Sequence, residues 1–167
     1  MVTKVKGATA SNASEVDMLS GEAVEDAVNA RIIFKTGIAE LEALVGSTGD
    51  VVNLSLPMRG GEFVWRSGDQ SAKVTSDPFQ GIWIAGAGDA TGASGAWMRR
   101  YFGPINVLWF GAVGDAVSDD GPTIQAANDY VEKTLRYGGI LFFPKPTGGY
   151  KSFQKLRVGG WVTWRGS

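Results

Sequence analysis

Hydrophobic and polar positions follow three different patterns along the 167 residues of the chain. Residues 1–14 are small and polar. From residue 20 to residue 46, one stripe of positions recurs three and four residues apart, with acids in the first turns and a glycine at the end, which predicts a helix. The stripe consists of Val24, Ala27, Arg31, Phe34, Ile38, Leu41 and Val45.

This stripe has two interpretations. Heptad spacing predicts the seam of a trimeric coiled coil, in which the following side chains would meet across the threefold axis: Val24, Phe34, Ile38, Leu41 and Val45. The same spacing also fits a single amphipathic helix that lies on its own domain. Residues 1–46 are therefore expected to form an N-terminal tail and helix, and the spacing alone does not choose between the two arrangements.

Residues 47–105 carry short apolar and aromatic clusters separated by Gly, Ser, Asp and Pro, which is typical of a small all-β module. The predicted strands are 51–56, 62–65, 72–75, 81–86 and 96–102. Three tryptophans, Trp65, Trp83 and Trp97, fall on these strands. We predict that they fill the core of this small module, with a sugar-stacking platform as the alternative.

Two further stretches of this module could suggest ligand binding, but we predict no binding role for either. Residues 86–95 are rich in glycine but lack the Lys-Ser/Thr of a phosphate-binding loop, and a Trp-containing strand follows them, so we predict a flexible loop. Arg99 and Arg100 are adjacent near the end of a predicted strand. We expect this pair to be solvated, with anion binding as the alternative.

Residues 106–167 follow a pattern of strand, loop, helix and further strands. The strands predicted in this region span 105–110, 139–144, 152–158 and 161–167. The helix is expected to begin at Asp119 or Asp120 as N-cap, with Pro122 in its first turn and Gly138 as C-cap. One face of this helix carries four apolar side chains: Ile124, Ala127, Val131 and Leu135.

Composition narrows the possible functions. The net charge is −1, so nucleic-acid binding would lack the usual electrostatic attraction to phosphates. The absence of Cys and His excludes Cys/His zinc clusters, thiol nucleophiles and Ser-His-Asp catalysis. No apolar leader and no apolar run long enough to span a bilayer is present, so we expect no membrane insertion, and no cofactor is indicated.

The acids Asp115, Asp119 and Asp120 could form a cation site or a pair of catalytic carboxylates. Adjacent carboxylates often diverge, however, and an Asp that precedes a helix can accept hydrogen bonds from its free N–H groups. We therefore predict that Asp119 and Asp120 act as helix caps.

The stretch "WFGAVGDAVSDDGPTIQAAND", followed by "GGILFFPKPTGGY" and a final "VTWRGS", resembles the capping segment of the pectate-lyase-like right-handed parallel β-helix proteins, especially phage tailspikes and capsular depolymerases. The resemblance covers residues 106–167. It implies that a strand and an amphipathic helix close the N-terminal end of a solenoid, and that "ILFFP" begins its first coil. Ala116 and Gly121 depart from the pattern, which more often has Gly and Thr there.

Elsewhere the stretches "GEFVWRSGD" and "GAWMRRYFGPINVLWFGA" are similar to the small β module that often precedes this segment in tailspikes. A cap is also expected on physical grounds, because an open solenoid end exposes unpaired backbone and an apolar interior. Such a solenoid needs about three or more coils for stability. We therefore expect the body of a longer protein to follow residue 167.

The leading hypothesis is a mainly β structural region that attaches a homotrimeric tailspike or tail fibre to a phage tail or baseplate protein, in a virion assembled in the host cytoplasm. The resemblance implies that the absent body binds or degrades a host surface polysaccharide, as a hydrolase or a lyase. No catalytic, cofactor-binding or metal-binding residue is assigned in this chain. Two alternatives stay open: an enzyme fragment that contributes Asp119 and Asp120 as catalytic acids, and a sugar-binding module that uses its tryptophans.

Overall fold

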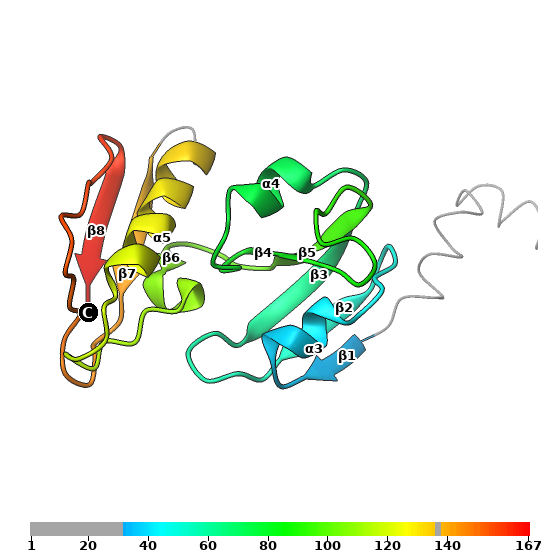
Figure 1. Ribbon diagram of the computed structural model, residues 1–167, viewed down its shortest axis with the longest axis horizontal. Coiled ribbons are helices and arrows are strands. Elements are labelled where there is room, and N and C mark those ends of the chain that lie inside the picture. The colour runs from blue at the N-terminus through cyan, green and yellow to red at the C-terminus, as the bar shows by residue number, and fades with distance from the viewer. Residues whose placement is uncertain (1–31, 136–137) are drawn as a thin grey trace, which may run out of the picture.

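The computed structural model describes residues 32–135 and 138–167, which form two β-sheets joined through a shared core (Figure 1). The first sheet has five strands in the order β1-β2-β3-β5-β4. Only the β1–β2 pair is parallel. The bounds are β1 (Ile32–Lys35), β2 (Val51–Leu54), β3 (Gly61–Ser67), β4 (Trp83–Ala85) and β5 (Gly95–Arg99), with short helices α3 (Ile38–Glu42) and α4 (Ser71–Thr75).

One face of this sheet forms a closed core. Cross-strand register places Val52 opposite Phe63 and Trp65 opposite Trp97, with the indoles in an edge-on contact at 5.1 Å between ring centroids. Helix α3 covers this face and contributes Leu41, which is fully buried. Burial of these large side chains is the main stabilising term for a sheet built from such short strands.

The second sheet is parallel throughout, in the order β6-β7-β8. Its strands are β6 (Ile105–Asn106), β7 (Gly139–Phe143) and β8 (Val162–Gly166). The 3-10 helix η1 (Val107–Phe110) and helix α5 (Gly121–Thr134) lie between β6 and β7 in the chain. Helix α5 lies against this sheet and against η1 (Figure 1). Its buried face contains Ile124, Ala127 and Val131, as the sequence predicts.

The two sheets share one apolar cluster. Ile82, Trp83 and Ala96 of the first sheet region pack with Ile105 and Leu141 of the second. The indole N–H of Trp83 also donates to the hydroxyl of Tyr130 on α5 at 3.2 Å. The molecule is therefore mixed β with few helices, and the regions 47–105 and 106–167 are packed together.

The helix predicted from residue 20 to residue 46 is wrong over its described part. Residues 32–35 form strand β1, and only Ile38–Glu42 is helical. Two β-branched residues followed by Phe favour a strand, and Gly37 has an extended backbone between the two elements. The expected boundary at residues 46 and 47 falls inside this unit, because β1 pairs with β2.

The coiled-coil seam is consequently wrong over residues 32–45. Phe34 and Val45 are exposed, whereas Leu41 is fully buried and Ile38 packs beside it in the core of the same chain. Side chains that face opposite environments cannot form one interhelical stripe. Val24, Ala27 and Arg31 lie outside the described residues.

Three strand predictions are also corrected. Residues 72–75 belong to α4, where Asp69 accepts the N–H of Ser71 at 2.9 Å and fixes the first turn. Residues 152–158 have no regular structure. The strand predicted over 105–110 is β6 for two residues, after which the Asn106 side chain accepts the N–H of Leu108 at 2.9 Å and the chain turns into η1.

Candidate functional site

The acidic segment before α5 is the first candidate site. Asp120 is 1% exposed, and its carboxylate accepts the N–H groups of Val113 at 2.6 Å, Gly114 at 3.2 Å and Lys151 at 3.3 Å. None of these donors belongs to the helix. Asp120 occupies the N-cap position of α5, but its side chain makes no capping hydrogen bond, so the prediction of a side-chain cap is wrong for this residue.

Asp119 and Asp115 hold neighbouring backbone. Asp119 Oδ1 accepts the N–H of Gly121, the first residue of α5, at 3.0 Å, and that of Phe153 at 3.1 Å. Asp115 accepts the N–H groups of Val117 and Ser118 at 2.8 and 2.7 Å, and these bonds hold its pKa below the ordinary range. Each of the three carboxylates therefore accepts a different set of backbone N–H groups, and they do not converge on one site.

This geometry decides what the acids can do. Asp120 joins two segments, residues 113–114 and Lys151, and Asp119 connects the start of α5 to the β7–β8 connection. Within residues 32–135 and 138–167, no group of three or more acidic side chains is placed to hold a metal ion. Asp120 is buried and both of its oxygens accept backbone N–H groups, so this carboxylate is a structural anchor; Asp119 lies at an exposed position.

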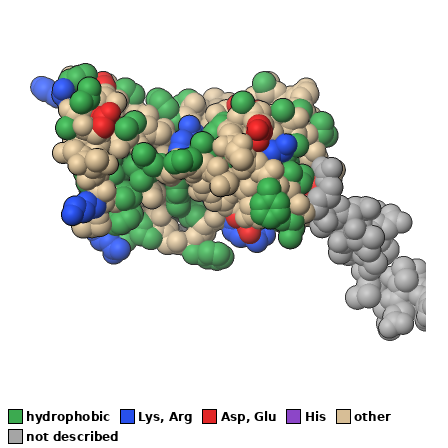
Figure 2. Space-filling view, turned by 90° about the horizontal axis from the view of Figure 1, so that it is seen from below, with side chains coloured by type: hydrophobic (Ala, Val, Ile, Leu, Met, Phe, Trp, Pro, Cys, Tyr) green, Lys and Arg blue, Asp and Glu red, His purple; other side chains and the backbone are tan. Residues whose placement is uncertain are grey.

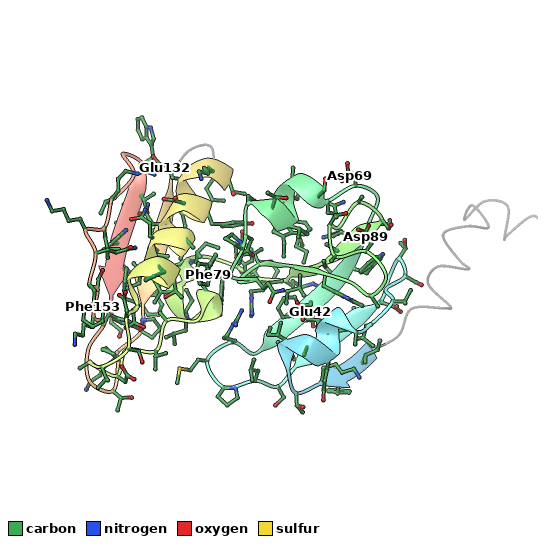
Figure 3. All side chains as sticks on the ribbon, viewed as in Figure 1. Glu42, Asp69, Phe79, Asp89, Glu132 and Phe153 are labelled. Carbon is green, nitrogen blue, oxygen red and sulfur yellow. The ribbon has the colours of Figure 1, made fainter. Side chains whose placement is uncertain are left out.

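The β7–β8 connection runs along α5 and is fixed to it at several points. Gln125 accepts the N–H of Arg157 at 2.7 Å and donates to its carbonyl at 3.0 Å. The Arg157 guanidinium reaches Glu132 at 2.8 Å on the next turns of the helix. Glu132 and Phe153 mark the two ends of this contact in Figure 3. The fourth predicted cap residue, Leu135, is partly buried at the end of α5 and packs on the same core.

The tryptophans of the first sheet are core residues. Trp97 is fully buried and Trp83 is 5% exposed. Their faces are covered by neighbouring side chains, so the expectation that these two fill the core is confirmed. Trp65 differs, because it is partly buried and lines a shallow cleft of about 590 Å³ with Thr48, Ser67 and Ser94.

The loop 86–95 forms the other wall of this cleft. Asp89 accepts the N–H groups of Thr91 at 3.0 Å and Ser94 at 2.6 Å, and hydrogen bonds to Thr91 and Ser94 lower the pKa of Asp89 well below its ordinary range. The loop thus has a defined internal hydrogen-bond network, at the same end of the sheet as Asp69 (Figure 3).

A buried arginine is the main feature that the sequence did not predict. Arg99, expected to be solvated, is 1% exposed and donates to the carbonyls of Gly81, Gly60 and Arg59 at 2.6 to 2.7 Å. Its guanidinium lies over the rings of Phe63 and Trp109. Burial, and next the charge of Arg59, lower the pKa of Arg99 to about 10.

Arg59 extends this cluster to the second sheet region. It donates to the carbonyls of Trp109 at 3.0 Å and Phe79 at 2.6 Å. Nearby, Asp77 accepts three N–H groups from residues 81–83, and burial raises its pKa. These charged groups are used to join loops of the two sheets. A run of "MRRY" gives no sign of this, because it does not show which arginine faces the core.

The face seen in Figure 2 carries scattered apolar side chains, with a few charged side chains among them. Among the most exposed apolar side chains of the described residues are Phe102, Trp161, Phe34, Val117 and Val45. No helix in the described ranges is both long and apolar enough to cross a membrane.

No protein-family model matches the sequence, and a search of curated proteins finds no match. The structure is similar to solved structures of phage tailspikes. It matches the Acinetobacter baumannii phage AM24 tailspike protein with a TM-score of 0.47, 21% identity and 66% of this chain covered. It matches Pantoea stewartii WceF, a glycan biofilm modifying enzyme with a tailspike-like parallel β-helix fold, with a TM-score of 0.45, 17% identity and 81% covered.

The enzymatically active domain of bacteriophage CBA120 tailspike protein 2 matches with a TM-score of 0.46, 17% identity and 80% of this chain covered. The chain spans only 17%, 21% and 18% of the lengths of these three neighbours.

Proposed function

We propose that this chain is the structural N-terminal region of a tailspike-like protein, in which α5 and β6–β8 begin and close a parallel β-helix. The first sheet would be the attachment module. The body of the protein would bind or degrade a host surface polysaccharide, and the assembled spike would be a component of the phage tail.

The observation that carries this proposal is the parallel sheet that follows chain order. In a β-helix each coil adds one strand beside the last, so strands pair in parallel with their nearest predecessors. β6 pairs with β7 and β7 with β8 in this way. The apolar face of α5 rests on the same core as Leu141 of β7. An amphipathic helix in this place would shield the interior from water.

The acids support a structural role for this region. Asp119 and Asp120 are the candidate catalytic pair, and both are engaged by backbone N–H groups. A general acid or nucleophile has to reach its substrate. The burial of Asp120, together with the backbone bonds to both carboxylates, therefore favours attachment over hydrolysis or elimination for this chain.

A homotrimer and a docking partner in the phage tail or baseplate belong to the proposal. Because residues 32–45 do not form the expected seam, the contact between copies would have to come from other surfaces. Light scattering of the purified chain at micromolar concentration should give three times the monomer mass, and a monomer would contradict association through this region.

Two assays test the attachment role. The purified chain should sediment together with phage tails stripped of their spikes, and unlabelled full-length spike should compete with it. The chain should release no reducing ends or unsaturated products from capsular polysaccharide. Turnover that is lost in Asp119→Asn or Asp120→Asn without unfolding would replace the structural assignment by a catalytic one.

The cleft at Trp65 gives the sugar-binding alternative one specific observation, a partly exposed indole beside hydroxyl side chains. Titration with host-type oligosaccharides should leave the tryptophan fluorescence unchanged if the chain is an attachment module. A saturable change that is absent from a Trp65→Phe variant would favour sugar binding.

A further inference from the structure

The face of the five-stranded sheet opposite α3 carries a shallow hollow beside α4. The sheet register places Met98 of β5 next to Trp83 of β4, and Arg66 points to the same face from the end of β3. Helix α4 lies beside β4 (Figure 1), and Lys73 and Gln70 complete this side of the lining. The hollow has a volume of about 480 Å³, and we call it the basic hollow.

The two bases of the basic hollow have no acidic partner in the described part of the chain. Arg66 and Lys73 are exposed, and neither is part of an ion pair there. Asp69 lies between them in the sequence, but its carboxylate accepts the N–H of Ser71 at 2.9 Å. Of the described residues that line the hollow, none is acidic. Two uncompensated positive charges at one concave surface favour an anion there.

The ammonium group of Lys73 is held in place before any ligand arrives. Gln70 donates to the carbonyl of Ser67 at 3.0 Å and accepts a hydrogen bond from Lys73 Nζ at 2.9 Å. The same ammonium lies 4.5 Å from the centroid of the Trp83 ring. Gln70 uses one of the three N–H donors of Lys73, so donors remain for a ligand. A side chain ordered in advance loses less conformational entropy on binding.

We propose that the basic hollow binds the carboxylate of an Asp or Glu side chain, carried by an acidic segment of the phage tail protein that receives this module. The proposal rests on the attachment role proposed above. The carboxylate would lie between the guanidinium of Arg66 and the ammonium of Lys73, in charge-assisted hydrogen bonds. The methylene groups of the same side chain would pack on Met98, which is partly buried at the floor of the hollow.

An acidic sugar would supply the same carboxylate, but the floor of the hollow favours a peptide. Trp83 is only 5% exposed, and Lys73 covers its ring. This indole therefore offers no open face on which a sugar ring could stack. A short flexible side chain needs no such face.

Titration of the full chain with a fluorescein-labelled hexaglutamate peptide tests the proposal by fluorescence anisotropy. Binding should saturate at low salt and weaken at least about fivefold at 0.5 M salt, because the charges are screened. Arg66→Gln and Lys73→Gln should each weaken binding at least about fivefold. Arg100→Gln is the matched control, since it removes the same charge from a half-exposed position outside the hollow, and it should change binding less than about twofold.

Three results of this titration would overturn the proposal. Absence of binding to the native chain would show that the hollow does not take a carboxylate. Equal weakening in all three variants would show attraction to the net charge of the chain without a site. If unlabelled trigalacturonate displaces the labelled peptide at a lower concentration than unlabelled hexaglutamate does, the hollow is a site for an acidic glycan.

Sedimentation with spike-stripped phage tails separates this proposal from the attachment role. The native chain should sediment with the tails, and Arg66→Gln/Lys73→Gln should reduce the bound fraction at least about fivefold with an unchanged circular dichroism spectrum. If the native chain and the double variant sediment equally, the attachment role stands and the basic hollow is not its contact. If the native chain does not sediment, the attachment role fails and the hollow has no partner in the tail.

Discussion

The two sheets of this molecule are held by different kinds of contact. The parallel sheet depends on α5 and on the backbone anchors Asp119 and Asp120. These carboxylates accept local N–H groups two to seven positions away, and also those of Lys151 and Phe153, which lie 31 and 34 positions away. The five-stranded sheet depends on Arg99, whose three carbonyl partners lie 18, 39 and 40 positions away. Local contacts therefore contribute to the first region, whereas every bond made by Arg99 in the second is long-range.

The largest effect is expected for Arg99→Ala, which breaks the long-range side of this comparison. The substitution removes three charge-assisted hydrogen bonds and leaves the carbonyls of Gly81, Gly60 and Arg59 without their donor. We expect a loss of about 3–5 kcal/mol in the free energy of unfolding, measured by urea denaturation. Arg100→Ala is the control, because that side chain is half exposed, and it should cost less than about 1 kcal/mol.

Asp120→Ala is expected to follow, with a loss of about 2–4 kcal/mol. A lost helix cap alone would cost about 0.5–2 kcal/mol. The larger figure is expected because the buried carboxylate accepts the N–H groups of Val113, Gly114 and Lys151. Asp119→Ala, at an exposed position, is the matched control and should remain within the range of a lost cap. Equal losses for the two variants would contradict the anchor assigned to Asp120.

The same contrast explains what the sequence could predict. The start and the buried face of α5 are predicted well because the apolar face, Pro122 and the preceding acids are all local signals. The predicted end is wrong, because the helix stops at Thr134 with Leu135 as C-cap, before the expected Gly138. The buried face of Ile124, Ala127 and Val131 follows directly from helical periodicity. The hydrogen-bond donors to Asp120 could not be predicted. The sequence shows that an Asp precedes a helix, but not which backbone N–H groups its carboxylate accepts.

Predictions in the five-stranded sheet failed where pairing decides the structure. The spacing from Val24 to Val45 fits a helix, but residues 32–35 pair with β2 and become a strand. Tertiary contacts override such a local pattern when a β-branched segment can complete a sheet. Arg99 was missed for the same reason, since only the register with Phe63 places it on the core face. Successive side chains of a strand point to opposite faces of the sheet, so one of the two adjacent arginines is expected to face the core. This alternation does not show which of the two it is.

Leu135→Ala is expected to have a smaller effect, about 2 kcal/mol, at the low end for a buried leucine. Leu135 lies at the end of α5 and is only partly buried, although it packs on the shared core. Thermal or urea denaturation measures the loss, and Leu141→Ala, at a fully buried position on β7, should cost more. A silent Leu135→Ala would show that the last turn of α5 does not contribute to covering the core.

The smallest expected effect is local and depends on pH. The backbone N–H groups of Ser118 and Val117 lower the pKa of Asp115 in the folded protein. A carboxyl whose folded pKa is lowered contributes stability above its unfolded pKa and loses it as the pH falls through the folded value. Amide exchange of Val117 and Ser118 should therefore accelerate as the pH falls below about 4, beyond the intrinsic pH dependence of exchange. Asp115→Asn should remove this acid dependence, whereas Asp119→Asn, which removes a carboxylate from the same segment without touching these two amides, should retain it. If both variants keep the acid dependence, the loop is held by contacts other than Asp115, and the local side of the comparison does not extend beyond Asp119 and Asp120.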